Sequence, residues 1–223
     1  MFFLVNKPKW VTSHDVVDKF KRIFHWEKIW HSGTLDPMAT GLLIIAIKRE
    51  STKHLGKLLW MDKTYITEID FSILTDTWDM DYYDTIINYE LWIMNSKKWI
   101  IKDWKFIVSP SLEEIKNKLD LLIPECELPL TMFSAKKRDG KKLYELARQG
   151  IDLKLKQVMK INSYEILAYD FPKLKLKLNV GSGTYIRSIW YWLWQQLWLG
   201  WTLIMLHRES IGPFRLNKNN NIS

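Results

Sequence analysis

Apolar and polar positions alternate along the chain with the periods of short strands and helices. Residues 2–5 are apolar and precede a polar, proline-containing turn, and the run 42–47 is apolar at every position. The first pattern predicts a strand that enters a turn, and the second predicts a buried strand. Residues 66–71 and 173–180 alternate with a period of two, which predicts strands with one buried face.

Helical spacing appears in three further places. Apolar residues recur every three or four positions after Thr12 and Ser13, and either of these side chains is a good N-cap. Amphipathic helices are also expected over residues 51–59 and from about 188 to 197, the latter followed by a strand over 202–206.

The middle of the chain is less regular. Residues 75–79 predict a polar turn, and residues 80–108 show no clean period, which indicates an irregular or hairpin-containing insertion. Ser109 as N-cap, with Pro110 at the first helical position, predicts a helix that ends near Leu121. No linker or repeat divides the chain before this point.

Length and composition narrow the class of protein. The chain has 223 residues, enough for one large domain or two small ones, and its formal net charge is +8. That charge is compatible with a polyanionic partner without requiring one. Cys126 is the single cysteine, which excludes an intrachain disulfide and a cysteine-rich metal site and fits a reducing compartment.

Targeting signals are not evident. The longest apolar runs fall far short of the ~20 residues that a membrane span needs. Residues 1–5 are too short for the core of a signal peptide. We therefore expect a cytoplasmic protein without a membrane segment.

The stretch 31–41 places one carboxylate, Asp36, among small and hydroxylated residues. Pro37 disfavours helical backbone at Asp36, while Gly33 and Gly41 permit backbone angles closed to other residues. Asp36 should therefore lie in a turn whose backbone conformation is restricted. Taken alone, this pattern also fits a loop whose Asp and Thr side chains satisfy backbone groups.

The full string of residues 31–41, His-Ser-Gly-Thr-Leu-Asp-Pro-Met-Ala-Thr-Gly, resembles the catalytic motif of the TruB family of tRNA pseudouridine synthases. The resemblance implies that Asp36 is the catalytic residue, either as a nucleophile or as the carboxylate that stabilises the cleaved sugar. It also implies that His31 contacts the RNA left behind when the target base flips out.

Other segments resemble further motifs of the same family. Asn6-Lys7-Pro8 resembles its first motif, although an N-terminal strand, turn and helix with no catalytic role could have the same sequence pattern. Lys63-Thr64-Tyr65 resembles the second, which implies that Tyr65 stacks on the target base; an aromatic residue that opens a strand can equally belong to the core.

The segment 181–189 resembles the third motif. Its Arg187 follows Tyr185 by two positions, so both side chains would face the same side of an extended segment. The resemblance implies that Arg187 pairs with Asp36, and that Tyr185 and Leu206 line the pocket.

The block 132–150 resembles the segment that borders the RNA-binding cleft of the family. It combines basic side chains, which neutralise phosphates, with Phe133 and Tyr144, which can stack on unpaired bases. A solvated basic helix would look similar. The predicted RNA-binding residues are Lys136, Lys137, Arg138, Lys141, Lys142 and Arg148.

The resemblance implies an α+β fold, with a mixed, largely antiparallel sheet flanked by helices and a catalytic cleft across the sheet. Residues 1–215 would form the catalytic domain, and 216–223 a disordered polar tail. Many relatives continue into a small RNA-binding domain of the PUA type, for which we expect no room in this chain.

The implied activity is isomerisation of uridine to pseudouridine at position 55, in the T-loop of tRNA, by a monomer without a metal or cofactor. A non-catalytic tRNA-binding or tRNA-folding module is the alternative from another class of protein. A guide-RNA-dependent pseudouridine synthase is a nearer alternative, which the expected absence of a PUA domain disfavours.

Tryptophan is unusually abundant, with 13 Trp against 9 Gly, whereas glycine alone usually makes up about 7% of residues. Trp10, Trp30, Trp194 and Trp198 stand where the resembled motifs have glycine. Our hypothesis is that the source organism decodes a nominal stop codon as glycine, so that these positions are glycine in the native protein.

Overall fold

The computed structural model describes residues 1–25, 27–72, 74–79, 101–102, 105–106, 109–130, 137–138, 141–143, 153, 155–197 and 201–216. The helices are α1 (Ser13–Ile23), α2 (Arg49–Trp60), α4 (Leu112–Asp120) and α6 (Ile186–Leu197). The strands are β1 (Phe2–Lys7), β2 (Ile29–His31), β3 (Thr40–Ile47), β4 (Lys63–Asp70), β5 (Leu74–Asp79), β6 (Ile101–Lys102), β7 (Lys105–Phe106), β8 (Glu125–Pro129), β9 (Lys137–Arg138), β10 (Lys141–Lys142), β11 (Lys156–Asp170), β12 (Lys173–Val180), β13 (Trp201–Ile211) and β14 (Phe214–Arg215).

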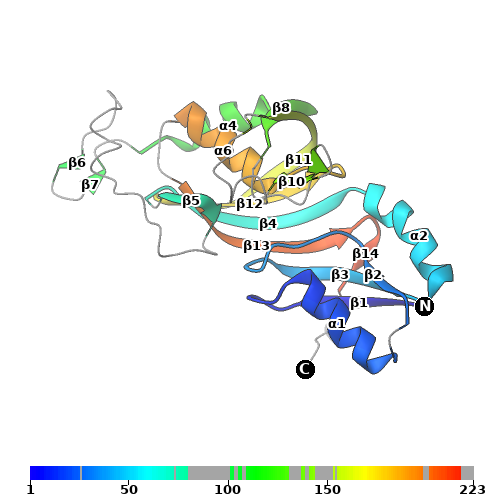
Figure 1. Ribbon diagram of the computed structural model, residues 1–223. Helices are drawn as coiled ribbons and strands as arrows, with labels where there is room; N and C mark the ends of the chain where they lie inside the picture. The colour runs from blue at the N-terminus through cyan, green and yellow to red at the C-terminus, as the bar shows by residue number, and fades with distance from the viewer. Residues whose placement is uncertain are drawn as a thin grey trace.

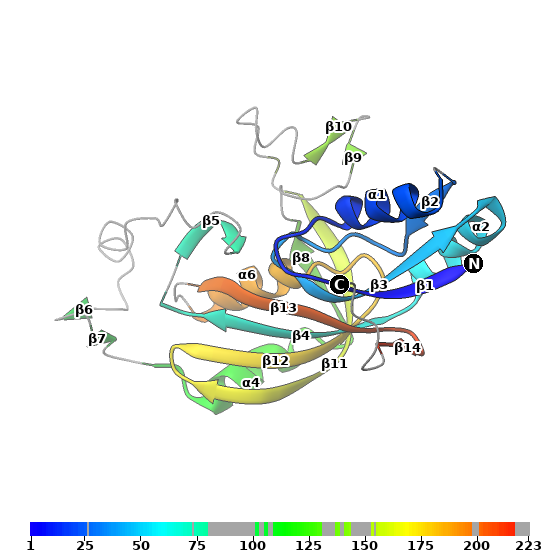
Figure 2. The same cartoon turned by 90° about the horizontal axis from the view of Figure 1, so that it is seen from below.

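One large sheet organises these elements, with strand order β1-β3-β13-β4-β12-β11-β8 (Figures 1 and 2). Strand β2 also pairs with β3, and strands β5 and β14 pair with β13. Only the pairs β13–β3 and β13–β5 are parallel among the paired strands of the described residues. The predicted α+β fold with a mixed, largely antiparallel sheet is confirmed.

Strand β3 is covered on both faces, which explains its unbroken apolar sequence. Leu43, Ile45 and Ile47 pack with side chains of α1 on one face. Leu42, Ile44 and Ala46 pack with Leu55 and Leu58 of α2 on the other. A strand buried on two faces has no position for a polar side chain, so the alternation seen elsewhere disappears.

The opposite half of the sheet carries α4 and α6 on one face (Figure 1). Leu174, Leu176 and Leu178 of β12 are fully buried beneath these helices, together with Ile115 of α4 and Ile189 of α6. The intervening lysines of β12 point away from this core, so the strand has one buried face, as its alternating sequence predicts.

Two predicted N-caps can be compared with the structure. Thr12 caps α1 and forms a capping box with Asp15. The prediction of Ser109 as a cap is wrong, because Ser111 caps α4 and exchanges hydrogen bonds with Glu114. Ser111 has an acidic residue three positions later, which Ser109 lacks, and only that spacing closes the box.

The prediction of a polar turn over residues 75–79 is also wrong. These residues belong to β5, which pairs in parallel with β13 through Leu74 opposite Trp201 and Asp79 opposite Leu203. The pairing with a distant strand imposes extended backbone here, and local composition does not reveal such a partner.

Several predicted features lie outside the described residues. Within 80–108 the structure describes only β6 and β7, which pair with each other. Most of the block 132–150 and residues 217–223 of the predicted tail are likewise outside. The division of the chain into a domain over 1–215 and a tail stays a prediction. None of the helices formed by the described residues has the length and apolar character that crossing a bilayer demands.

Candidate active site

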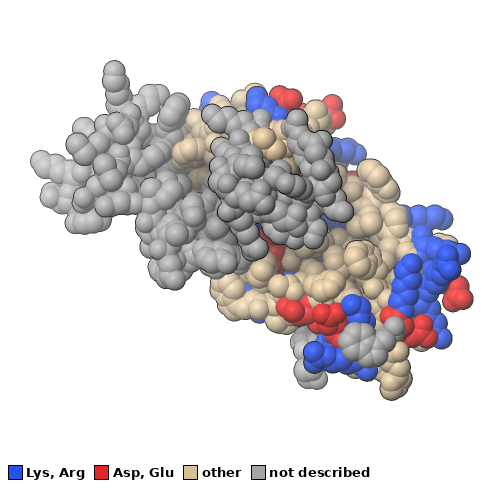
Figure 3. Space-filling view, viewed as in Figure 1, with Lys and Arg blue, Asp and Glu red and all other residues tan. Residues whose placement is uncertain are grey.

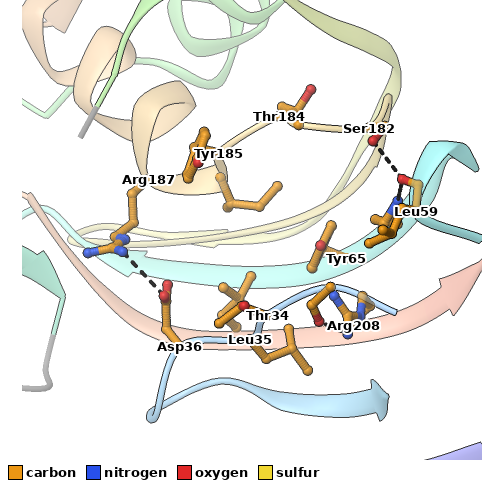
Figure 4. Close-up of a pocket in the computed structure, with 15 residues that line it drawn as sticks. Thr34, Leu35, Asp36, Leu59, Tyr65, Ser182, Thr184, Tyr185, Arg187 and Arg208 are labelled. Atoms are coloured by element: carbon orange, nitrogen blue, oxygen red, sulfur yellow. Dashed lines mark hydrogen bonds and ion pairs between the residues drawn. The ribbon is translucent and has the colours of Figure 1, made fainter. Parts of the chain in front are cut away.

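A cavity of about 460 Å³ opens between the 33–36 turn, strands β4 and β13, and the loop that leads into α6 (Figure 4). Its volume lies within the usual range for small-ligand sites, about 300–1,000 Å³. The predicted site residues that line it are Asp36, Tyr65, Tyr185, Arg187 and Leu206. The structure therefore brings together five side chains from four separate parts of the sequence.

Asp36 and Arg187 face each other across this cavity. The Arg187 Nη2 atom lies 3.3 Å from the Asp36 Oδ1 atom. The arginine side chain is 7% exposed and the aspartate side chain 31%. A buried cation thus holds a carboxylate that remains open to the cavity, an arrangement in which the carboxylate can meet a ligand in a fixed orientation.

The backbone around Arg187 differs from the prediction. Tyr185 and Arg187 do not share an extended segment, because α6 begins at Ile186 and Arg187 lies in its first turn. Burial of Ile186, Ile189 and Trp190 at helical spacing favours the helix. Tyr185 precedes the helix, and its carbonyl accepts a hydrogen bond from the Ser188 N–H, so both side chains still reach the cavity.

The turn that carries Asp36 is held by Lys7, whose side chain is fully buried. The Lys7 ammonium donates to the carbonyls of Pro8 at 2.9 Å, Val11 at 2.5 Å and Pro37 at 3.2 Å. Burying an ammonium is costly unless several acceptors surround it. Lys7 therefore joins the first loop of the chain to the residue that follows Asp36.

A second anchor comes from the start of α1. The Leu35 N–H donates to the Ser13 Oγ at 2.8 Å, and that hydroxyl donates to the Leu35 carbonyl at 3.2 Å. Both polar groups are buried. The residue before Asp36 is thereby tied to a helix N-terminus.

Arg208 forms the third anchor, and the sequence analysis missed it. It is 1% exposed, and it donates from Nε to the Leu42 carbonyl at 2.7 Å and from Nη2 to the Gly33 carbonyl at 3.1 Å. Its backbone lies against Gly41, where an added Cβ would sit 2.3 Å from the Arg208 carbonyl oxygen. Arg208 stands between His207 and Glu209, so its sequence neighbours gave no sign of burial, and its partners lie more than 160 positions away.

Lys63, which begins the segment that resembles the second motif, also lines the cavity. Its ammonium donates to the carbonyls of Leu59 at 2.8 Å and Met61 at 2.6 Å. Burial, and then the neighbouring Arg208 guanidinium, lower the pKa of Lys63 to about 8. The cavity therefore has a second buried cationic side opposite the Asp36–Arg187 pair.

Known proteins resemble this chain in sequence. Residues 21–186 match the model of the TruB family pseudouridylate synthase N-terminal domain. The chain belongs to this family.

Two curated relatives, both named tRNA pseudouridine synthase B, extend the match. The protein from Protochlamydia amoebophila is 38% identical over 214 residues, which are 96% of this chain and 74% of that protein. The protein from Caldicellulosiruptor saccharolyticus is 37% identical over 212 residues, which are 95% of this chain and 67% of that protein. Both matches therefore cover more of the chain than the 21–186 segment matched by the family model.

The fold is shared with a solved Cbf5–Nop10–Gar1 complex. The chain aligns with a TM-score of 0.69 and 22% identity, covering 99% of this chain and 51% of that one. It spans about half the length of that protein, and the likeness shows the pseudouridine synthase fold.

His31 is not among the residues that line the cavity. Its ring stacks on Trp30 with centroids 5.7 Å apart, and its Nδ1 accepts a hydrogen bond from the Gly33 N–H at 3.3 Å. Burial and the Arg208 guanidinium lower the pKa of His31 to about 4. At neutral pH the ring is therefore uncharged, with its proton on Nε2.

The predicted RNA-binding residues cannot be placed at the cavity. Lys136 and Arg148 lie outside the described residues, and of Lys137, Arg138, Lys141 and Lys142 the structure describes only the backbone pairing of β9 with β10. Among the described residues there is no cluster of three or more His, Cys, Asp or Glu side chains that could hold a metal ion.

Proposed function

We propose that this TruB-family chain isomerises uridine to pseudouridine in tRNA. The observation that carries the proposal is the Asp36 carboxylate, held 3.3 Å from the buried Arg187 guanidinium at the wall of a cavity that also contains Tyr65. A protein that only binds RNA has no evident use for a carboxylate in such a place, since carboxylates repel phosphates.

The reaction needs no oxidant or reductant. The bond between N1 of uracil and C1′ of the ribose breaks, a bond between C5 and C1′ forms, the C5 hydrogen leaves as a proton and N1 gains one. Asp36 would either attack C1′ as a nucleophile or stabilise the positive charge that develops on the sugar. Arg187 would orient the carboxylate for either role.

The target atoms are hidden while the uridine is stacked in a folded loop, so the base has to flip into the cavity. The cost of unstacking, a few kcal/mol, would be offset by stacking on an aromatic ring. Tyr65 is 8% exposed and rises from β4 in the middle of the cavity (Figure 4). We assign it the stacking role, with Tyr185 and Leu206 as walls.

His31 would contact the RNA that the flipped base leaves behind. Its neutral ring presents Nε2–H as a donor, because Nδ1 is occupied by the Gly33 N–H. The basic residues predicted between 136 and 148 would bind phosphates alongside. The T-arm uridine at position 55 is the proposed target, and the proposed setting is a cytoplasmic monomer.

The decisive experiment incubates the protein with an unmodified tRNA transcript and maps pseudouridine by carbodiimide modification. Wild-type protein should modify the T-loop uridine, and Asp36→Asn, which keeps the size of the side chain, should give none. A transcript with cytidine at that position should remain unmodified by wild-type protein.

Asp170→Asn is the matched control. Asp170 is exposed at the end of β11 and does not line the cavity, so this variant should retain wild-type activity. Equal modification by wild type and Asp36→Asn would remove Asp36 from the mechanism. Tight tRNA binding without modification by either protein would favour the non-catalytic module.

A further inference from the structure

A second groove shares no lining residue with the catalytic cavity. It has a volume of about 600 Å³ and is bordered by the end of α1, the segment 27–30 and the first half of α2. Its charged side chains are Lys21, Glu27, Lys28, Arg49 and Lys53. Four cations and one anion therefore surround a groove for which the proposed reaction has no use.

Three of the four cations of this groove have no carboxylate partner among the described residues. Among the described residues, no carboxylate lies within 4.0 Å of Lys28, Arg49 or Lys53, whereas Lys21 pairs with Asp18 at 2.9 Å. The one acidic side chain of the groove, Glu27, lies 3.9 Å from Lys48, a further cation.

Three lysines elsewhere on the sheet have anionic partners. Lys156, Lys175 and Lys177 lie 3.6, 3.8 and 2.8 Å from Glu127, Glu68 and Glu209, respectively. Since these lysines already have anionic partners within the protein, the three cations of the groove are better placed to attract an external anion.

The groove and the catalytic cavity are connected by α2. Arg49 and Lys53 line the groove, whereas Leu59 of the same helix lines the cavity. At a rise of 1.5 Å per residue the separation is about 9–15 Å along the helix. In Figure 3, Lys and Arg side chains gather over the end of the molecule that carries α2 in Figure 1.

We propose that this groove, formed by Lys28, Arg49 and Lys53, is a second RNA-binding site, which holds backbone phosphates of the substrate whose target base occupies the cavity. The span of about 9–15 Å corresponds to a few nucleotides, because successive phosphates of one strand advance by about 3.4 Å along a helix. The inference rests on the proposed function for the identity of the RNA. Trp30 also borders the groove, but the charges alone define the site.

The test compares two triple variants with the same loss of charge. The variant Lys28→Ala, Arg49→Ala, Lys53→Ala removes the groove. The control Lys173→Ala, Lys175→Ala, Lys177→Ala removes three lysines of β12 that alternate with core leucines and point away from the cavity. For each protein, the Kd for tRNA is measured at several salt concentrations, and pseudouridine formation is measured at saturating tRNA.

The groove variant should bind tRNA about tenfold more weakly at low salt, and the slope of log Kd against log salt should fall by about two to three. Its kcat should match that of wild type, which also shows that it is folded. The control should keep the wild-type Kd and slope. Replacing Lys28 and Lys53 by arginine should preserve the slope, because the charge remains.

Equal losses in the two triple variants would overturn the proposal, since they would reflect net charge alone, and so would an unchanged slope in the groove variant. Failure of the proposed function would appear separately, as absence of pseudouridine with wild-type protein.

Discussion

His31 is a titratable residue whose environment should make the stability of the protein depend on pH. In the folded protein its pKa is about 4, lowered from 6.5 by burial and by the nearby Arg208 cation. The unfolded chain therefore takes up a proton near pH 6.5, and the folded protein does so only near pH 4. The contribution of His31 to stability is fully present above pH 6.5 and is lost as the pH falls toward 4.

We expect the free energy of unfolding to decrease by about 1–3 kcal/mol between pH 7 and pH 4.5 through this residue. Urea denaturation at the two pH values measures the decrease, and in His31→Gln it should be smaller by that amount. An identical pH dependence in wild type and variant would show that His31 is not held neutral. Burial also lowers the pKa of His207, so only the difference between the two proteins isolates His31.

At the scale of elements, the candidate active site depends on the junction between β3 and β13. Gly41 has a φ angle of +104°, and its Cα faces the backbone of Arg208. This close contact lets the two strands pair in parallel through His207 opposite Thr40 and Arg208 opposite Gly41. The same contact places the Arg208 side chain against the Gly33 carbonyl in the turn that carries Asp36.

Replacing Gly41 by alanine should therefore damage both stability and activity. The added Cβ would lie 2.3 Å from a backbone oxygen, so one strand must move, and the φ angle is unfavourable for alanine. We expect a loss of about 3 kcal/mol or more in the free energy of unfolding, measured by urea denaturation.

Gly56→Ala provides the matched comparison. Gly56 lies within α2, and nothing lies within 4 Å of the Cβ that alanine would add. Because alanine is the better helix former, this variant should be more stable than wild type by about 1 kcal/mol. Equal stability of the two alanine variants would show that β3 and β13 do not need the glycine.

Elements with strong local signals could be predicted from the sequence. The apolar run of β3, the alternation of β12 and the capping residue of α1 specify their structures through side chains close in sequence. Strand β5 could not be predicted, since only pairing with β13 makes it extended. The spacing of two between Tyr185 and Arg187 predicts an extended segment, whereas burial of the neighbouring apolar residues selects a helix.

At the scale of the whole molecule, the candidate site divides in the same way. Asp36, Tyr65 and Arg187 were found because they stand in recognisable motifs, and the fold brings them to one cavity. Arg208 and Lys63 escaped notice because their importance comes from burial among carbonyls of distant segments. The net charge of +8 was compatible with a polyanionic partner, but it did not reveal which cations lack an internal partner.

The abundance of tryptophan concerns the whole chain, and the structure bears on it at one position. Trp10 has a φ angle of +65° and is 58% exposed, so a large side chain sits where glycine is favoured and gains little from burial. Trp30 belongs to β2 and Trp194 packs beside Tyr191 of α6, while Trp198 lies outside the described residues. The glycine hypothesis stays a prediction for all four.

Mass spectrometry of the protein purified from its own organism tests this hypothesis. The sequence as written corresponds to 26.8 kDa, and the native protein should be lighter by the difference between tryptophan and glycine at each of Trp10, Trp30, Trp194 and Trp198. Protein expressed from a gene with tryptophan codons at these positions serves as the reference, and peptide mapping assigns each difference. A native mass equal to the reference would mean that the tryptophans are genuine, and that β2 carries an exposed indole beside His31, where the RNA is proposed to pass.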